Sequence, residues 1–425
     1  MHLFSLVSTR APGQTWGISR KSARQFCARD MRPAKRRGVF AVEKKRETPQ
    51  RPAGKAGNGA TMSENRPFPP GATANEALPG ASSGSGGDAM SAAFSKTALP
   101  AAAALLREVY GIAGEAARLS SERDETFLFT AADGTRYTLK IANPAEDPAA
   151  LAFQDGALLH LAGHAPSVPV PRLVPTRAGA TSHRLATGEG PRIVRLLTFL
   201  PGELQYRTPS STAQSRHIGR ALGELDLGLS GYAGRPSEGK LMWDISHTLD
   251  LAAVVDSVAP ERQARVEAVL EEFLRMVPAI SALERRQIIH NDFNPHNILV
   301  DPAAPERVAG IIDFGDMVEA PLVNDLAVAI SYQLFTPDWA ERAGAFLEGY
   351  LSARPLLPSE AAMLPTLIRA RLAMSIIIAE WRSARFPENR SYIMRNHAAA
   401  WAGLHNISDL TPAGLKRLAP HLAEA

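Results

Sequence analysis

The stretch that decides the fold reads HNDFNPHNILV (residues 290–300). Its first eight positions hold two histidines, one aspartate and three asparagines, and the chain then becomes purely aliphatic. A short apolar run bounded by turn residues is typical of a buried strand. The arrangement recurs in GIIDFGD (residues 310–316), where an aliphatic run ends in an aspartate. Because paired strands bring their ends together, we expect Asp292, Asn297 and Asp313 to lie close to one another.

These residue types suit phosphoryl transfer from a nucleotide. The reaction needs a carboxylate that orients the attacking hydroxyl and accepts its proton, and hard oxygen ligands for a Mg²⁺ ion that bridges the phosphates. Asp292 can supply the first, and Asn297 with Asp313 can supply the second. The alternative is that the three residues only form turns and caps. Their joint order beside two aliphatic runs favours the chemical role.

A lysine precedes this region on a predicted hairpin. Residues 125–143 contain two β-rich runs joined by an Asp-Gly turn at residues 133–134, which is a strong hairpin signal. In the second run the apolar side chains share one face and leave Lys140 on the other. The next segment opens with Asp147 and Pro148, which predict the N-cap and first position of a helix.

The remaining pattern predicts a helical C-terminal half. Apolar residues at helical spacing begin at about residue 212, and only the runs NILV and VAGIIDF interrupt them as short strands. A β-rich front and a helical back describe a two-lobed α+β protein. We therefore expect a tail (1–94), an N-lobe (95–200) that holds the nucleotide-binding sheet, and a C-lobe (201–425) that holds the catalytic loop and the substrate pocket.

Charge separates the tail from the rest of the chain. Residues 1–60 contain 14 Lys and Arg against three acidic residues, whereas beyond residue 60 the 40 acidic residues outnumber the 33 basic ones. The basic and Gly/Pro/Ser-rich composition of residues 1–94 predicts disorder. It fits a targeting segment, a basic tail that touches polyanions, or translated sequence upstream of a start at Met62 or Met90. The excess of acidic residues beyond residue 60 argues against nucleic-acid binding by the folded part.

Cysteine and hydropathy favour a cytoplasmic protein. Cys27 is the single cysteine and falls in the tail, so no disulfide or thiolate metal site is expected in the folded part. The most apolar window, residues 372–381, is short and contains a charged residue, so we expect no membrane association. Residue types leave the oligomeric state open.

At this point the motifs resemble a known family. HNDFNPHNILV and IIDFGDM look like the aminoglycoside phosphotransferase, or choline-kinase-like, superfamily, which implies a protein-kinase-like fold. The likeness covers about residues 99–405 and is strongest to the hydroxylysine-kinase-like branch. Further segments carry the resemblance to that branch: LSSERDETFLF, YTLKIAN, IIDFGDMVEAPLVNDLAVAISY and AEWRSARFPENRSYIMRNHAAAWAGL.

The resemblance implies roles for individual residues. Asp292 would be the catalytic base, Asn297 and Asp313 the Mg²⁺ ligands, and Lys140 the lysine that contacts the phosphates of ATP or GTP. The remaining nucleotide-binding candidates lie in a phosphate-covering loop and in the linking strand: Ser120, Ser121, Arg123, Thr198 and Leu200.

One position departs from the family pattern. These kinases place a glutamate in the first helix of the N-lobe, where it pairs with the strand lysine, and this chain has Gly156 there. Asp155 is adjacent but turned by about 100° around a helix. Either Asp155 or Gln154 substitutes for the glutamate, or Lys140 is held by another group.

Supporting and substrate-binding residues are less determined by the sequence. We expect His290 to support the loop, His296 to lie on its surface, and Asp325 to cap a helix. An ammonium-bearing substrate would need carboxylates and aromatic faces, although packing and salt bridges explain the same residues. The candidates for this site are Asp316, Glu319, Trp243, Asp244 and Trp381.

Three classes of function follow. The first is a small-molecule kinase that phosphorylates the hydroxyl of an amino alcohol, most closely hydroxylysine, with choline, ethanolamine, aminopropanol, homoserine and aminoglycosides as other acceptors. The second is a nucleotide-binding pseudokinase, because the helix glutamate is missing. The third is a polyanion-binding protein that acts through the basic tail.

Overall fold

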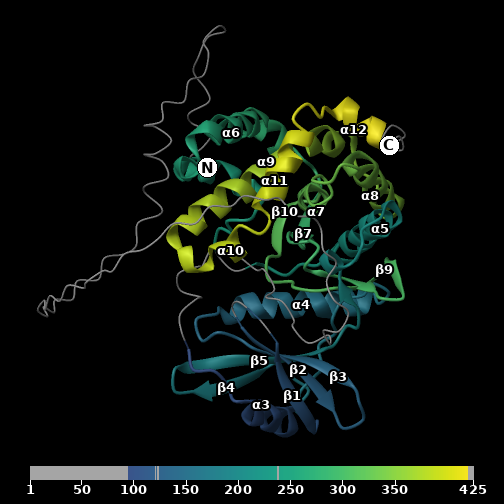
Figure 1. The fold of residues 1–425 in the computed structure, drawn as a ribbon. Helices are drawn as coiled ribbons and strands as arrows, with labels where there is room; N and C mark the ends of the chain where they lie inside the picture. The colour runs from purple at the N-terminus through teal and green to yellow at the C-terminus, as the bar shows by residue number, and fades with distance from the viewer. Residues whose placement is uncertain (1–93, 120, 122–123, 237–238, 420–425) are drawn as a thin grey trace, which may run out of the picture. The chain divides into compact units, whose positions relative to one another are not determined.

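A five-stranded antiparallel sheet begins the described part of the chain (Figure 1). The computed structural model describes residues 94–419, except residue 120 and residues 122–123 and 237–238. The strands follow the order β1-β2-β3-β5-β4. Their bounds are β1 (Gly114–Leu119), β2 (Glu125–Ala131), β3 (Arg136–Ile141), β4 (His183–Thr187) and β5 (Gly190–Thr198). Strands β2 and β3 form the predicted hairpin, and Gly134 adopts the positive φ of 83° that its tight turn requires.

Helices cover the two faces of this sheet. On one face Leu139 and Leu196 pack in a buried cluster with α3 (Leu99–Leu105) and the π-helical turn Leu106–Tyr110 that continues it. The opposite face carries Lys140 and its cross-strand partner Arg195. Helix α4 (Pro148–His164) packs there, since its Asp155 forms an ion pair with Arg195.

Helix α4 (Pro148–His164) begins as the sequence predicts. Pro148 occupies the first helical position, and the carboxylate of Asp147 accepts a hydrogen bond of 2.9 Å from the Ala149 N–H. The helix also packs toward the second half of the chain, because Leu158 and Leu161 share a buried cluster with Leu222 of α5. This helix therefore joins the sheet to the helical core.

The second half is mainly helical, as predicted (Figure 1). The apolar stripe predicted for α5 is buried, including Ile218, Leu222 and Leu225. The helices are α5 (Thr212–Gly228), α6 (Pro260–Ser281), α7 (Val323–Ser331), α8 (Trp339–Ala353), α9 (Pro358–Arg385), α10 (Arg390–Ile393), α11 (His397–Asn406) and α12 (Pro412–Leu418), with 3₁₀ segments at Gln205–Arg207, Ile245–Ala253, Val255–Ser257 and Pro387–Asn389.

Two small β elements lie among these helices. Strand β7 (Arg286–Ile289) pairs with β10 (Val318–Pro321). The other element contains β6 (Glu203–Leu204), β8 (Ile298–Asp301) and β9 (Ala304–Ile311). The two aliphatic runs form β8 and β9 as predicted, whereas the sequence did not predict β1 or the β7–β10 pair. The connection from β7 to β8 contains Asp292, and Asp313 follows β9.

The apolar stretch of helix α9 extends beyond the window at residues 372–381. Within the described residues it alone has the length and composition of a membrane-spanning helix, but 78% of its most apolar 18-residue window is buried inside the fold. Core helices of globular proteins have the same character, and α9 packs against α6, α7 and α11. Its apolar length is therefore explained by burial in the core.

The α+β class is confirmed, because the N-terminal part contains an antiparallel sheet with α3 and α4 and the C-terminal part is mainly helical. The predicted tail, apart from Phe94, lies outside the described residues. Residues from Phe94 onward belong to one compact unit, so the division of the folded chain at residue 200 stays a prediction.

Candidate active site

The loop that carries Asp292 is held by a carboxylate from a distant part of the chain. In the first turn of α7, Asp325 Oδ2 accepts a hydrogen bond of 2.8 Å from the His290 N–H, and its Oδ1 accepts one of 2.8 Å from the Asn291 N–H. Asn291 has a positive φ of 62°, an unfavourable conformation for a residue with a Cβ. The prediction that Asp325 caps its own helix is wrong: the N-cap is Leu322, and Asp325 positions the loop.

Asp325 lies next to a second buried carboxyl group, that of Asp226. Asp226 of α5 is fully buried, and its Oδ2 accepts a hydrogen bond of 2.8 Å from the Tyr350 hydroxyl. Burial and the neighbouring Asp325 raise the pKa of Asp226 well above its ordinary value. Hydrogen bonds from two backbone N–H groups favour the ionised form of Asp325. We infer that the pair shares one proton, which Asp226 holds and Asp325 accepts.

His290 is a neutral support for the loop, in the role that the sequence predicted. Its Nδ1 accepts the Asp292 N–H at 3.3 Å, so Nε2 carries the proton and donates to the Ile312 carbonyl at 3.2 Å. Complete burial lowers the pKa of the ring, which keeps it uncharged. His296 was predicted to lie on the loop surface, but it is partly buried against Tyr206, with ring centroids 4.4 Å apart. Burial, and to a lesser extent the positive charge of Arg395, lowers the pKa of His296 to about 4.

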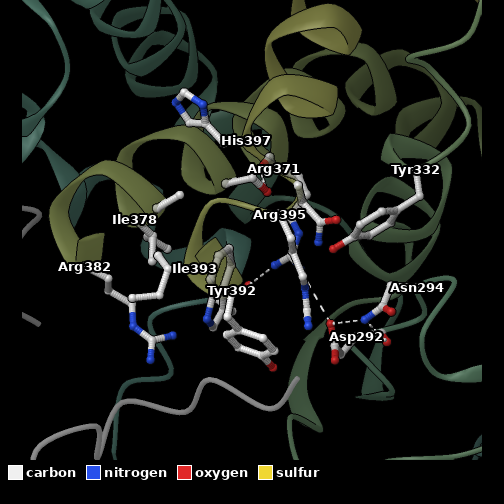
Figure 2. A pocket seen from close by; sticks show the side chains of 14 residues that line it. Asp292, Asn294, Tyr332, Arg371, Ile378, Arg382, Tyr392, Ile393, Arg395 and His397 are labelled. Atoms are coloured by element: carbon white, nitrogen blue, oxygen red, sulfur yellow. Dashed lines mark hydrogen bonds and ion pairs between the residues drawn. The ribbon is translucent and has the colours of Figure 1, made fainter. Parts of the chain in front are cut away.

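Both carboxylate oxygens of Asp292 are fixed by hydrogen bonds. Asn294 Nδ2 donates to Oδ1 at 2.8 Å, and Asn297 Nδ2 donates to Oδ2 at 2.7 Å. The guanidinium of Arg371 on α9 forms an ion pair with Oδ1 at 3.8 Å, drawn as a dashed line in Figure 2. These contacts leave the carboxylate little rotational freedom, which is what a positioned base requires.

The electrostatic surroundings of Asp292 favour proton acceptance. Its side chain is only 9% exposed. Burial and the nearby Asp316 carboxylate raise its pKa well above the ordinary value, and Arg371 opposes this shift. A raised pKa makes a carboxylate a stronger base toward a hydroxyl proton.

Asn297 and Asp313 meet at the ends of paired strands, as predicted. Ile298 and Ile311 are register partners, and the Asn297 carbonyl accepts a hydrogen bond of 2.9 Å from the Ile312 N–H. The side-chain Oδ1 of Asn297 is buried and has no hydrogen-bond partner among the described residues. Asp313 adopts a positive φ of 63°.

An unsatisfied amide oxygen beside a carboxylate is a donor set that fits Mg²⁺, which prefers hard oxygen ligands. Within the described residues no group of three or more His, Cys, Asp or Glu could hold a metal ion. Asn297 and Asp313 are two residues, and one of them is an asparagine, so they do not form such a group. In kinases Mg²⁺ takes its other ligands from phosphates and water.

Lys140 lies beside an ion pair that the sequence did not predict. On the neighbouring strand, the buried Arg195 donates to Asp155 Oδ1 at 3.0 Å and to Gln154 Oε1 at 3.2 Å. The Lys140 charge acts on the Asp155 carboxyl, but the two are not within the 4.0 Å of an ion pair. Asp155 and Gln154, the two candidates to replace the helix glutamate, therefore bind Arg195.

Packing explains why residue 156 is a glycine. A Cβ at this position would lie 2.4 Å from the hydroxyl oxygen of Tyr232. That hydroxyl donates a hydrogen bond of 2.6 Å to the Phe153 carbonyl, and the two rings stack with centroids 5.7 Å apart. The space that a glutamate would need is thus filled by a tyrosine from the second half of the chain.

The nucleotide-binding candidates are only partly described. Ser120 and Arg123 lie outside the described residues, and Ser121 is partly buried at the edge of that gap. Thr198 ends β5, and its Oγ1 accepts a hydrogen bond of 2.9 Å from the Arg172 N–H. Leu200 follows in the linking segment and packs over Gly310. The nucleotide roles of these residues stay predictions.

A pocket opens next to Asp292 (Figure 2). It encloses ≈ 630 Å³, open solvent at its mouth included. Most of its wall comes from α9 and the segment that follows it. The lining residues are Trp243, Asp292, Asn294, Tyr332, Arg371, Ser375, Ile378, Ala379, Arg382, Tyr392, Ile393, Arg395, Asn396 and His397.

Of the five substrate-binding candidates, Trp243 alone is among these lining residues. Arg371 lies over its ring, 5.0 Å from the centroid. Asp244 is buried and caps the 3₁₀ segment after it by accepting the Ser246 N–H at 2.8 Å. Asp316 is buried near Asp292.

The other two candidates lie away from the pocket lining. Glu319 is exposed on β10. Arg385 stacks on Trp381 at 4.8 Å from the ring centroid. Sequence reasoning missed Arg371, Arg382, Arg395 and Tyr332 as pocket residues. For Arg382 and Arg395 the one signal was the arginine-rich stretch that follows the apolar part of α9, and Arg371 and Tyr332 lie before that stretch.

Comparison with known proteins agrees with this geometry. The sequence profile of the phosphotransferase enzyme family (APH) matches residues 115–363. Hydroxylysine kinase of Mus musculus is 28% identical over 356 residues, which are 77% of this chain and 94% of that enzyme. Homoserine kinase of Gluconacetobacter diazotrophicus is 32% identical over 239 residues, 55% of this chain and 70% of that enzyme.

A solved structure has the same fold. The microcompartment-associated aminopropanol kinase superposes with a TM-score of 0.58 at 21% sequence identity, and the match covers 74% of this chain and 98% of that one. The profile match spans more than half of the chain, and the predicted kinase-like fold is confirmed by this neighbour. The chain is therefore a member of the phosphotransferase enzyme family.

Proposed function

We propose that this phosphotransferase moves the γ-phosphate of ATP to the hydroxyl of a small amino alcohol related to hydroxylysine. The observation that supports it best is the buried Asp292, fixed by Asn294 and Asn297 at the wall of a pocket. Relatives named hydroxylysine kinase align with most of this chain, which favours a hydroxylysine-like acceptor over choline, ethanolamine or an aminoglycoside.

In this proposal Asp292 accepts a hydrogen bond from the acceptor hydroxyl and takes its proton as the oxygen attacks phosphorus. The two asparagines keep the carboxylate turned toward the pocket, and Asp325 keeps the loop in place. Lys140 would contact the phosphates from the sheet. Asn297 Oδ1 and Asp313 would hold Mg²⁺, which when bound neutralises charge on the phosphates. GTP is the alternative donor, and cytoplasmic location stays a prediction.

The pseudokinase is the second candidate, and the arrangement around Lys140 favours it. Asp155, the carboxylate nearest in sequence to the missing helix glutamate, pairs with Arg195 instead of with Lys140. A lysine without a carboxylate partner loses the orientation that the glutamate gives in kinases.

Nucleotide consumption by the full chain distinguishes the two candidates. ATP and GTP would be supplied separately with Mg²⁺ against hydroxylysine, homoserine, ethanolamine, aminopropanol, choline and kanamycin, with mass spectrometry of the products. Asp292→Asn, which keeps the shape of the side chain and removes the base, is the control. Turnover of an amino alcohol that this variant lowers by about 10²–10⁴-fold supports the kinase. Nucleotide binding without turnover of any acceptor supports the pseudokinase.

A further inference from the structure

The pocket beside Asp292 carries excess positive charge. Three arginines line it, Arg371, Arg382 and Arg395, and the single lining carboxylate is Asp292 itself. This charge is local, because acidic residues outnumber basic ones over the chain beyond residue 60. The pocket therefore has the wrong sign for an acceptor whose charge is an ammonium group alone.

Two of the three guanidinium groups have no carboxylate partner among the described residues. Arg371 uses its charge on Asp292 and donates to the Trp243 carbonyl at 2.8 Å. Arg395 lies over the Tyr392 ring, 4.3 Å from its centroid, and makes no ion pair within the described chain. The same is true of Arg382 in the last turn of α9. The one carboxylate in that turn region, Glu380, pairs with His397 at 2.8 Å.

Two buried donors in the same wall also lack acceptors. The indole Nε1 of Trp243 and the Nε of Arg371 are buried without a hydrogen-bond partner among the described residues. A buried donor without an acceptor costs about 1–3 kcal/mol, and both donors add to the excess of donor groups in this wall. The aromatic face that an ammonium group would use is covered by Arg371 at 5.0 Å.

Of the two arginines without a carboxylate partner in the described chain, Arg395 lies nearer to Asp292 than Arg382 does (Figure 2). The charge of Arg395 acts on His296, which directly precedes the predicted Mg²⁺ ligand Asn297. It also acts on Tyr332, which the charge of Asp292 influences as well. Arg382 lies on the far side of the pocket from Asp292 (Figure 2). Arg371 already uses its charge on Asp292, so a negative group on a short acceptor would meet Arg395 before Arg382 when the acceptor hydroxyl reaches Asp292.

We propose that the acceptor is a hydroxy acid whose carboxylate binds Arg395, with Arg382 adding attraction at the far side of the pocket. This rests on the proposed kinase function and narrows its substrate class. Hydroxy amino acids are accepted, and amino alcohols without a carboxylate are poor substrates. Guanidinium groups suit this role because their paired N–H donors match the two oxygens of a carboxylate.

The test uses acceptor pairs that differ only in the carboxylate. The full chain would be assayed with hydroxylysine and its decarboxylated diamine, and with homoserine and its decarboxylated counterpart 3-amino-1-propanol. We expect kcat/KM about ten- to hundredfold higher for the carboxylate member of an accepted pair, the range for one charge-assisted contact. Arg395→Gln should bring the ratio close to one by lowering kcat/KM for the carboxylate member only. Arg382→Gln should lower the ratio by a smaller factor.

Arg385→Gln is the matched control, because Arg385 is an exposed arginine on the same helix that does not line the pocket. It should leave the ratio unchanged. Equal turnover of both members of each pair overturns the inference while the kinase function stands. A rise in the KM for ATP rather than for the acceptor in Arg395→Gln also overturns it, because Arg395 would then serve the donor. No turnover of any acceptor means that the proposed kinase function itself has failed.

Discussion

Asp325 Oδ2 accepts a hydrogen bond of 2.8 Å from the backbone N–H of His290, although 35 residues separate them. This contact anchors the loop that carries Asp292 to the start of α7. The same carboxylate accepts the N–H of Asn291, whose positive φ would otherwise relax. The position of Asp292 thus depends on a side chain outside its own loop.

We expect Asp325→Asn to lower kcat by about 10²-fold with little change in the KM for ATP. The amide keeps the shape of the side chain but points a donor at one of the two backbone N–H groups, which shifts the loop, and a shift of about 1 Å at a catalytic group costs about this much. Steady-state kinetics check it. Tyr350→Phe, in the same buried cluster but not in contact with the loop, should keep kcat within about threefold.

Asp226→Asn should stabilise the protein more as the pH rises. The folded protein holds a proton on Asp226, whose pKa is raised, while the unfolded chain releases it near pH 3.9. The stability from this group is therefore complete below about pH 3.9 and is lost as the pH rises toward the folded pKa. Asparagine keeps the hydrogen bonds to Asp325 and Tyr350 without this loss.

Urea unfolding at about pH 5 and about pH 9 measures this effect as the free energy of unfolding of the variant minus that of the wild type. The difference should grow in favour of the variant, by at most about 1.4 kcal/mol per pH unit. Asn in place of the exposed Asp409 is the control and should show no such trend. A difference that is flat with pH would mean that Asp226 is ionised in the fold.

Gly156→Ala should destabilise the wild type by about 1–3 kcal/mol, because the new Cβ would lie 2.4 Å from the Tyr232 hydroxyl. In a Tyr232→Phe background the nearest ring atoms are 3.3 and 3.4 Å away, and alanine should be neutral or stabilise the helix by up to about 1 kcal/mol. A double-mutant cycle from thermal or urea unfolding measures the coupling. Equal costs in both backgrounds would show that the hydroxyl does not exclude larger residues here.

Asp155 and Lys140 should respond differently to substitution. Asp155→Ala leaves Arg195 buried without its carboxylate and should cost about 3–5 kcal/mol of stability. Lys140 is only partly buried and makes no ion pair with a described residue, so Lys140→Met should leave the melting temperature nearly unchanged and raise the KM for ATP. Calorimetry and kinetics of the two variants check this. Unchanged nucleotide affinity in Lys140→Met would remove the lysine from the proposed phosphate site.

Local signals explain what the sequence predicted correctly. The hairpin at Gly134, the helix start at Asp147 and the strand after Asn297 each depend on residues within one turn or one strand. The closeness of Asp292 and Asn297 could be predicted because both lie in one short loop.

Long-range packing explains what the sequence could not predict. Asp325 looked like a helix cap because its partner His290 lies in another element. Gly156 looked like a lost glutamate because Tyr232, which fills its space, lies 76 residues later. Arg371 looked like an ordinary helix residue, and only the packing of α9 turns it toward Asp292.

The division of roles between α7 and α9 has a consequence for protein engineering. Asp292 is anchored by Asp325 on α7, while Arg382 lies in the last turn of α9 and Arg395 in the segment that follows it. Arg382 and Arg395 can be exchanged without touching the hydrogen bonds that orient Asp292. Libraries at these two positions can therefore be screened for new acceptors, and natural divergence of acceptor choice could follow the same route without loss of the chemical step.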